Sequence, residues 1–344
     1  MIRPIDTSID KILLFSTDAV LKHKFQTTND HVIGNLRWGR LLEVLDKLAE
    51  DVALAYVRRN NPEAKVVTAA IDDIELHTPV DINQDLILHA RINYAGQRSM
   101  EVGIRIDQIG TVGSLASAYF TMVAIPADGQ PKESLHLETL NYEDEMERFR
   151  YAAAIERRNA YKRDLEEIGT PPSAEEFEML NSLHAAQEDP EFKGLLAADM
   201  VKNNIERMYP DKENVPETIF GGYLIRRAFE LALMHAEELA SHRPVVVRIN
   251  RINFLQSVRI GDKLNFNSRI TYTGHSSLCV EVNIERTSVD KVTKALSNTC
   301  VFTFVNVDRN MLPKEVAKVY PTTYAEDARY LKAYRRKKTV INKC

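Results

Sequence analysis

The sequence has few cysteines and no metal-binding spacing among them. Only Cys279, Cys300 and Cys344 occur in 344 residues. An odd number of widely separated cysteines argues against a disulfide framework and lacks the paired spacing of a zinc site. The sequence therefore predicts a protein of a reducing compartment that holds no metal.

Long apolar runs and an excess of one charge are also missing. The most apolar run, residues 115–125, is shorter than the roughly 20 residues that span a bilayer. Lys and Arg number 45 against 49 Asp and Glu, so no overall basic field is available to bind DNA. Asp6 and Asp10 interrupt any secretory signal, and Arg3 is the only arginine between positions 1 and 20. We expect no transmembrane segment and no DNA partner, and no mitochondrial presequence is evident in this numbering.

An internal repeat is the strongest positive signal. Three pairs of segments match in the same order along the chain, namely 38–50 with 221–233, 91–100 with 269–278, and 120–123 with 302–305. The separation between the two members is nearly the same in all three pairs. Such a series predicts a tandem duplication with halves near 25–125 and 205–307.

Each half begins with a helical pattern and continues with alternating strands. After Gly39, apolar residues recur at helical spacing, and the segment after Gly222 is apolar nearly all round. Period-two patterns then flank tight turns at Gly96 and Gly274, and strands joined by such turns are antiparallel. A sheet that curls around one long helix is an α+β arrangement, the hotdog fold. The sequence predicts a double hotdog whose two sheets pair edge to edge, because such pairing protects open sheet edges.

The segment between the halves is charged and helix-prone. Ser173 follows two prolines and precedes Glu176 by three positions, the spacing of a helix-capping box. We expect an N-terminal hotdog domain at 1–140, a helical connector at 141–204 and a C-terminal hotdog domain at 205–344. The run 335–338 is expected to be a solvated basic tail, although such a run can also contact RNA or acidic lipid.

The sequence resembles the tandem hotdog acyl-coenzyme A thioesterases, most closely their mitochondrial branch without a lipid-binding tail domain. The resemblance spans roughly positions 25–335. The matching words are Gly39-Arg40-Leu41-Leu42-Glu43 with Asp46, Ser99-Met100-Glu101-Val102, Pro172-Ser173-Ala174-Glu175-Glu176, Ile219-Phe220-Gly221-Gly222-Tyr223-Leu224, Ala228-Phe229-Glu230-Leu231-Ala232, Arg243-Pro244, Phe302-Thr303-Phe304 and Thr323-Tyr324-Ala325-Glu326 with Tyr330-Leu331. The resemblance implies hydrolysis of fatty acyl-coenzyme A, a mitochondrial matrix location and an assembly of several tandem chains.

Thioester hydrolysis needs an oxyanion site and a carboxylate that activates water. The first N–H groups of a helix are unpaired and carry a partial positive charge, so the helix starts at Gly39 and Gly222 are both candidates. The resemblance implies that one half supplies the helix start and the other supplies an Asp. Asp46 matches that Asp, whereas the equivalent residue of the other half is Phe229. At most one competent site is therefore expected, joining Asp46 to Gly222; read alone, Asp46 also fits an exposed helix charge balanced by a neighbouring lysine.

The segment before Gly222 departs from the family pattern. The family has two amides in this segment. This chain keeps the first as Asn214 and has Glu217 in place of the second, and Thr218 could still donate a hydrogen bond to a thioester oxygen. Glu217 could even serve as a base, although its charge would repel the developing oxyanion. In the N-terminal half, Asn35 is a suitable amide near Gly39, but its partner across the seam would be Phe229.

The start of the C-terminal half has a local excess of positive charge. The segment 221–270 carries eight Lys and Arg against four Asp and Glu. Coenzyme A phosphates could use this excess. The candidates are Arg226, Arg227, Arg251 and Lys263. Ordinary surface patterning explains the same residues, and Arg251 also fits an exposed strand position.

Two functions of different classes remain open. The first is an acyl-coenzyme A thioesterase that uses Asp46 as base and the Gly222 amide as oxyanion donor, with acyl-CoA as substrate and no resident cofactor. The second is a hotdog protein without catalysis that serves as a structural or acyl-binding subunit of a larger mitochondrial assembly. Glu217, Phe229, Asn250 and Arg251, which replace family residues, favour the second. A homo-oligomer of tandem units or a place in a larger complex is expected in either case.

Overall fold

The computed structural model describes residues 2–30, 32–126, 135, 137–168, 170–215 and 218–341. The N-terminal half contains η1 (Pro4–Thr7), β1 (Ile9–Leu13), α1 (Ala19–Phe25), α2 (Trp38–Val57), β2 (Lys65–Ile71), β3 (Ile74–Leu76), β4 (Leu86–Ala95), β5 (Ser99–Gln108) and β6 (Ser114–Ile125). Then follow α3 (Glu145–Ile168), α4 (Ala174–Ala185), η2 (Ala186–Glu188), β7 (Leu195–Leu196), β8 (Val201–Arg207), η3 (Pro210–Lys212), β9 (Glu213–Val215) and β10 (Thr218–Ile219). The C-terminal half continues with α5 (Gly221–Glu237), β11 (Arg243–Ile249), β12 (Ile252–Asn253), β13 (Lys263–Thr273), β14 (Ser277–Thr287), β15 (Lys294–Val307), β16 (Val319–Tyr320) and α6 (Tyr324–Ile341).

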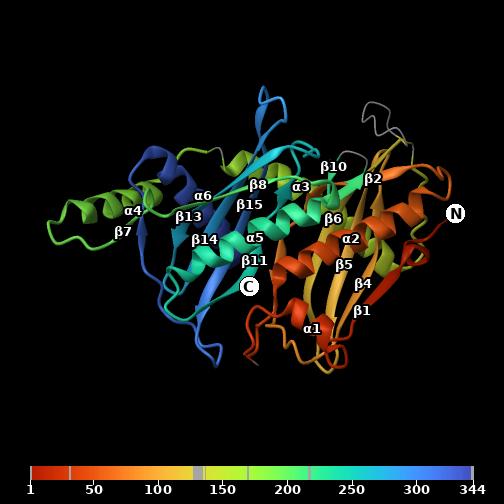
Figure 1. Ribbon diagram of the computed structural model, residues 1–344, viewed down its shortest axis with the longest axis horizontal. Helices are drawn as coiled ribbons and strands as arrows, with labels where there is room; N and C mark the ends of the chain where they lie inside the picture. The colour runs from red at the N-terminus through yellow and green to blue at the C-terminus, as the bar shows by residue number, and fades with distance from the viewer. Residues whose placement is uncertain are drawn as a thin grey trace.

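A single twelve-stranded sheet runs through both halves, and α2 and α5 lie across one of its faces (Figure 1). On α2, the residues at helical spacing after Gly39 are all buried, among them Leu41, Leu45 and Val52. These side chains meet the alternate, inward-facing residues of the strands in one continuous core. The expected double hotdog, an α+β fold with one long helix for each curved sheet, is confirmed.

The glycine turns join antiparallel strands, as the sequence predicts. In the β4–β5 hairpin the Gly96 amide donates to the Ser99 carbonyl at 2.8 Å, and in the β13–β14 hairpin the Gly274 amide donates to the Ser277 carbonyl at 2.7 Å. The same turn therefore recurs at the same place in both halves.

The two sheets join through short strands at a central seam. Ile71 of β2 pairs with Ile252 of β12, and Ile249 of β11 pairs with Ile74 of β3. Ile249 is the counterpart of Ile71 in the repeat, and Ile252 is the counterpart of Ile74, so the two pairs exchange. The seam thus has the reciprocal contacts of a twofold interface, and the expected edge-to-edge pairing is confirmed.

The repeat extends beyond the segments that the sequence comparison found. The outer edges of the sheet are β1 and β8, in which Ile9 pairs with Ala90 and Lys202 pairs with Ser268. Each half is followed by a helix on the opposite face of the sheet, α3 against β4 and α6 against β13. The predicted boundary at 204 falls inside β8, because this strand completes the C-terminal sheet, and α3 packs as part of the N-terminal half.

The connector begins its second helix as predicted. The Ser173 hydroxyl accepts from the Glu176 amide, and the Glu176 carboxylate accepts from the Ser173 amide, so the capping box is confirmed. The expectation of a solvated basic tail is wrong for Arg335. This residue lies in α6, its side chain is 13% exposed, and it pairs with Glu176. Its contacts with α4 fix the end of the connector to the C-terminal half.

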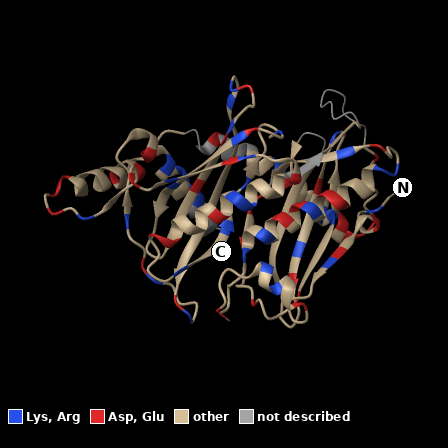
Figure 2. Cartoon of the chain, viewed as in Figure 1, with Lys and Arg blue, Asp and Glu red and all other residues tan. Residues whose placement is uncertain are grey.

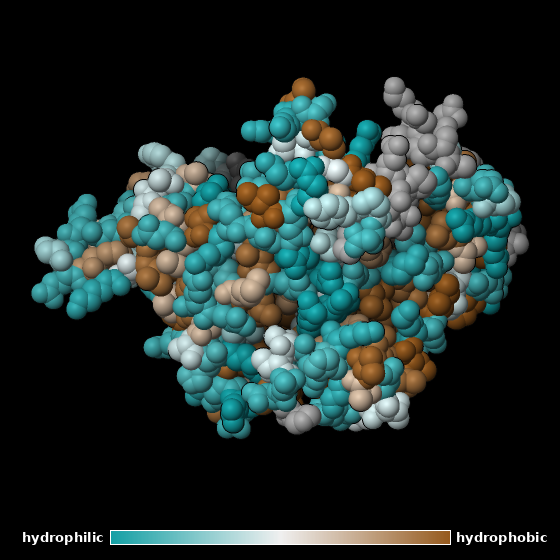
Figure 3. Space-filling model, in the orientation of Figure 1, coloured by the Kyte–Doolittle hydropathy of each residue, from teal (hydrophilic) through white to brown (hydrophobic). Residues whose placement is uncertain are grey.

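Charged residues of both signs alternate along the exposed sides of α2 and α5 (Figure 2). The face seen in Figure 3 is mostly hydrophilic, with apolar side chains in small separate groups. Among the described residues, no helix is long and apolar enough to cross a membrane.

Candidate active site

Asp46 lies at the seam between the halves, against the start of α5. It occupies the third turn of α2, and its side chain is fully buried. A Cβ atom placed on Gly222 would stand 3.1 Å from Asp46 Oδ2, and one placed on Gly221 would stand 3.4 Å away. The absence of side chains at these two positions lets the carboxylate approach the helix backbone closely.

The two oxygens of Asp46 have different surroundings. Oδ1 accepts a hydrogen bond from the Thr68 hydroxyl of β2 at 2.7 Å. Oδ2 is buried and has no partner of good hydrogen-bond geometry among the described residues. Burial raises the pKa of Asp46 to about 6, while Thr68 and the nearby Gly222 amide oppose that rise. The carboxylate is thus ionised at neutral pH and is still basic enough to take a proton.

Two aromatic rings enclose this end of α5. A Cβ atom on Gly222 would meet Phe220 Cε1 at 2.7 Å, and one on Gly221 would meet Phe254 Cε1 at 2.9 Å. Both rings are only partly buried. Apolar rings beside the first turn of α5 lower the local dielectric constant, which strengthens the interaction between the helix N–H groups and any negative charge.

The equivalent place at the start of α2 is filled by side chains. A Cβ atom on Gly39 would stand 3.2 Å from Arg226 Cγ and 3.4 Å from Phe229 Cδ1. Because the start of each helix meets the middle of the other, α2 and α5 run antiparallel across the seam. Phe229 stands where Asp46 stands in the other half, so this second place has no base.

The two other predicted hydrogen-bond donors, Asn35 and Thr218, each lie three positions before the start of one of the two long helices. Asn35 is buried in the loop before α2, where its Oδ1 accepts from the amides of Thr27 and Thr28 and its Nδ2 donates to the carbonyls of Thr28 and Asp30. Its amide therefore shapes that loop. Thr218 is half-buried in β10, three positions before α5. Glu217 lies outside the described residues, and so does the side chain of Asn214.

Comparison with known proteins finds similarity to thioesterases in both halves of the chain. A model of the thioesterase superfamily matches residues 39–112 and 217–293, one region in each half. One region similar to the thioesterase superfamily thus lies in each half of the chain. Acyl-coenzyme A thioesterase 9, mitochondrial, of Mus musculus is 28% identical over 97% of this chain and 78% of its own length. Acyl-coenzyme A thioesterase 2, chloroplastic, of Humulus lupulus is 28% identical over 92% of this chain and 77% of its own length.

A solved structure is also similar. An acyl-CoA hydrolase from Staphylococcus aureus, in complex with butyryl coenzyme A, coenzyme A and coenzyme A disulfide, has a TM-score of 0.39 and 28% identity. It covers 43% of this chain and 92% of its own.

The surroundings of Asp46 include a residue that the sequence analysis missed. Thr68 is the hydrogen-bond donor that orients Asp46, and it lies in a strand otherwise made of apolar residues and one lysine. Its counterpart in the C-terminal half is Val246, which pairs with Phe304 as Thr68 pairs with Met122. A polar residue in one half at the position where the other half has an apolar residue was the signal in the sequence that could have identified Thr68.

The four predicted phosphate ligands are not gathered into one cluster. Arg226 points to Glu43 of α2 at 3.6 Å, and Arg227 pairs with Glu206 of β8. Lys263 is exposed on β13. Its side chain is on the opposite face of the sheet from Arg227, because it precedes the inward-facing Leu264 that pairs with Glu206.

Arg251 takes part in the seam between the halves. Its guanidinium pairs with Asp72 and lies 4.0 Å from the centre of the Tyr161 ring, and its amide donates to Asp73. Asp73 also pairs with Arg248. Arg251 stands where the N-terminal half has Asp73. Opposite charges therefore meet across the seam, whereas two identical halves would place carboxylates against each other. Among the described residues, no group of three His, Cys, Asp or Glu side chains is arranged to hold a metal ion.

Proposed function

We propose that this protein hydrolyses acyl-coenzyme A to the free acid and coenzyme A, with Asp46 as the general base. The supporting observation is the buried carboxylate at the start of α5, which has one oxygen oriented by Thr68 and one without a partner among the described residues. The relatives named above are acyl-coenzyme A thioesterases, which supports the same reaction class.

The chemistry follows from the positions of these groups. A water molecule that donates a hydrogen bond to Asp46 Oδ2 transfers that proton as its oxygen attacks the thioester carbonyl. The negative charge that develops on the carbonyl oxygen is stabilised by the N–H groups of the first turn of α5, with Gly222 in contact range. The carbon–sulfur bond then breaks, and the thiolate of coenzyme A leaves and takes up a proton.

Only the Asp46 side of the seam is proposed to be catalytic. Phe229 fills the equivalent place of the other half and cannot accept a proton. The loss of catalysis therefore applies to the site at Phe229, while the proposed site at Asp46 keeps its base. Phe220 and Phe254 must move aside for the acyl chain to reach Asp46, since their rings cover the start of α5.

The substrate, the compartment and the assembly of this protein are proposed by analogy with its relatives. Acyl-coenzyme A is the proposed substrate, and no resident cofactor is needed for the reaction. The location proposed is the mitochondrion, which is in the names of several relatives. An assembly of several tandem chains is also proposed, and light scattering of the purified protein measures it directly.

The deciding experiment replaces Asp46 by Asn, which keeps the shape of the side chain and removes its basicity. Release of free thiol from acyl-coenzyme A of several chain lengths is followed with a thiol reagent. The wild type should hydrolyse at least one chain length, and Asp46→Asn should reduce kcat by about a hundredfold or more.

A matched control is Asp51→Asn on the same helix, because Asp51 is exposed and pairs with Lys47. It should retain full activity. A folded Asp46→Asn variant with unchanged kcat would exclude this residue as the base. A folded wild type that hydrolyses no acyl-coenzyme A would favour the structural or acyl-binding alternative.

A further inference from the structure

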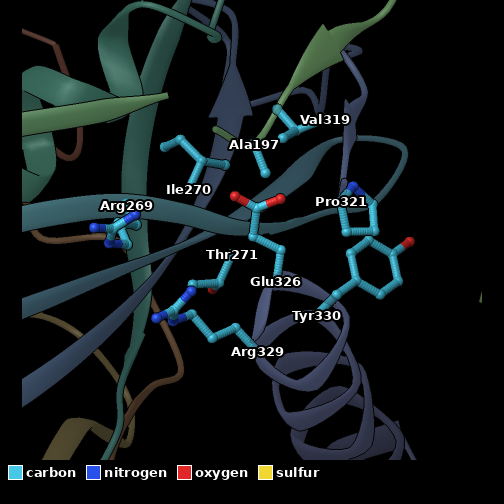
Figure 4. Close-up of a pocket in the computed structure, with 9 residues that line it drawn as sticks. All are labelled: Ala197, Arg269, Ile270, Thr271, Val319, Pro321, Glu326, Arg329 and Tyr330. Carbon is cyan, nitrogen blue, oxygen red and sulfur yellow. The ribbon is translucent and has the colours of Figure 1, made fainter. Parts of the chain in front are cut away.

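A small hollow lies between β13, the start of α6 and the β7–β16 pair, on the face of the sheet opposite to α2 and α5. It is lined by two arginines, Arg269 of β13 and Arg329 of α6, together with Thr271, Glu326 and Tyr330. Figure 4 shows both guanidinium ends on one side of the hollow, the Glu326 carboxylate near its centre and the Tyr330 ring beyond. We propose that this hollow is a binding site for a phosphate group, separate from the Asp46 site.

The N-terminal half contains the same arrangement. Arg91 of β4 corresponds to Arg269 of β13, since both begin the matched segments 91–100 and 269–278. In each half the strand also carries a tyrosine that contacts a tyrosine of the following helix. The ring centres are 5.8 Å apart for Tyr94–Tyr151 and 5.0 Å apart for Tyr272–Tyr330.

The helix starts also correspond. Glu147 of α3 accepts from the amide of Glu143, four positions earlier, and Glu326 of α6 accepts from the amide of Thr322, again four positions earlier. Glu147 is therefore the counterpart of Glu326. The third residue after each glutamate is an arginine, so Arg150 of α3 is the counterpart of Arg329.

In the N-terminal copy, a segment of the chain itself fills the space. The Arg3 guanidinium lies 3.2 Å from Glu147, 3.1 Å from Asp144 and 3.3 Å from Glu143. Its neighbour Ile2 forms a parallel bridge with Leu140, which fixes this segment beside the start of α3.

In the C-terminal copy, Leu195 pairs in parallel with Val319, the equivalent of Leu140. The segments that contain Ile2 and Leu195 therefore run in the same direction beside equivalent residues of the two halves. The next residue is Leu196, so a leucine stands in this copy where the other has Arg3. The hollow adjoins Glu326, the counterpart of the Glu147 that Arg3 contacts in the N-terminal copy.

The charge of the two copies differs as a result. In the N-terminal copy, three carboxylates, those of Glu143, Asp144 and Glu147, lie beside Arg3, and Asp144 and Glu147 also lie near Arg91.

In the C-terminal copy, Thr322 and Thr323 replace two of those carboxylates, while both arginines remain. Burial works against ionisation of Glu326, but hydrogen bonds from Thr322 hold its pKa below the ordinary value, so it is ionised. The residues that line the hollow thus carry two guanidinium groups against one carboxylate, a balance that favours an anion.

The partners of the two arginines leave donors available for a ligand. Arg269 Nε donates to Asn267 Oδ1 at 2.9 Å, and Arg329 Nε is 3.7 Å from Glu281, beyond normal hydrogen-bond length. A pair of guanidinium groups presents planar forks of N–H donors that match the oxygens of a phosphate. The hollow thus combines positive charge with hydrogen-bond donors that suit a phosphate group.

The test is equilibrium dialysis of the wild-type protein with radiolabelled inorganic phosphate at fixed ionic strength. We expect about one phosphate bound per chain, since the N-terminal copy is filled by Arg3. Arg269→Gln and Arg329→Gln should each weaken binding by about tenfold or more, the cost of losing one charge-assisted contact. The matched control is Arg91→Gln in the filled copy, which should leave phosphate binding unchanged.

A second variant does not remove any residue of the hollow. Leu196→Arg places a guanidinium where the N-terminal copy has Arg3, and it should abolish phosphate binding while the protein stays folded. Binding that survives both Leu196→Arg and Arg269→Gln, or that is lost in Arg91→Gln, would overturn the proposal, and so would a folded wild type that binds no phosphate.

The source of the phosphate group is resolved by competition. If the group belongs to coenzyme A, coenzyme A should displace labelled phosphate far better than its 3′-dephosphorylated form. If the ligand is a free phosphate, neither form should compete.

Discussion

Asp46 is subject to two opposing influences. Removing a carboxylate from water disfavours its charged form, whereas the Thr68 hydroxyl and the backbone at Gly222 favour it. Burial is the larger effect, and it raises the pKa to about 6. A general base near neutral pH requires such a pKa, and the folded protein is less stable because of it.

Replacing Asp46 with Asn should therefore stabilise the protein at neutral pH. The pKa is raised from 3.8 to about 6 in the folded state, so ionisation lowers stability progressively between these values and fully above pH 6. Asp46→Asn should raise the free energy of unfolding at pH 7.5 by up to about 3 kcal/mol. Urea unfolding at several pH values measures this gain, which should shrink toward zero near pH 4. A gain independent of pH would contradict the assigned pKa.

The pH dependence of catalysis should report the same group. The value of kcat/KM should fall as the pH drops below about 6, where Asp46 becomes protonated. Thr68→Val removes the hydrogen bond that favours the anion, so this acidic limb should move to higher pH. The control is Val246→Thr, which adds a hydroxyl at the equivalent position of the other half and should leave the limb in place. An unmoved limb in Thr68→Val would show that Thr68 does not position the base.

At the scale of elements, the start of α5 and the start of α2 have become different. Both contain glycine at the second helical position, and both meet the other helix across the seam. At Gly222 the neighbour is a carboxylate, and at Gly39 it is a phenylalanine ring. The same local sequence signal therefore leads to a candidate oxyanion site in one half and to helix packing in the other.

Alanine substitutions at the two glycines should separate these roles. Gly222→Ala places a methyl group 2.7 Å from Phe220 and 3.1 Å from Asp46, within the space that a substrate needs. We expect kcat/KM to fall by about a hundredfold, as for a small displacement of reacting groups. Gly39→Ala has contacts no closer than 3.2 Å and should leave kcat/KM within about threefold of wild type, with stability lowered by about 1 kcal/mol. Equal losses of activity in both variants would count against the one-sided site.

At the scale of the whole molecule, the two halves are held together by a seam that has lost its symmetry. Asp73 accepts from the Arg251 amide and pairs with Arg248, so this one carboxylate joins the N-terminal half to two positions of the C-terminal half. Arg251 in turn pairs with Asp72. These contacts are specific to unlike halves, because the equivalents of Asp72 and Asp73 are Asn250 and Arg251.

Removing this link should destabilise the junction. Asp73→Ala leaves a half-buried guanidinium and an amide without their acceptor, and it should lower the free energy of unfolding by about 1–3 kcal/mol. Urea unfolding gives this value. The exposed ion pair of Lys47 with Asp51 provides the control, and Asp51→Ala should change stability by less than about 1 kcal/mol. A similar small effect for Asp73→Ala would mean that the seam does not depend on this carboxylate.

The sequence by itself determined the repeat, the helix-and-hairpin order of each half and the capping of α4. These features depend on local spacing: apolar residues at helical intervals after Gly39, glycines at hairpin turns, and Ser173 three positions before Glu176. Burial, turn geometry and capping act over a few residues, so they can be recognised in one dimension. The family resemblance also predicted that Asp46 and Gly222 act together; the structure places them close to each other, and their joint catalytic role stays a prediction.

Only the tertiary structure decided which polar groups meet. Thr68 reaches Asp46 from another element, Arg251 is used at the seam, and Arg335 is held by the connector. It also showed that α3 and α6 are equivalent, with Arg3 bound at the start of α3 and Leu196 at the corresponding position beside α6. Long-range contacts depend on how the sheet brings distant parts of the chain together. The partner of a charged side chain therefore cannot be read from the residues near it in the sequence.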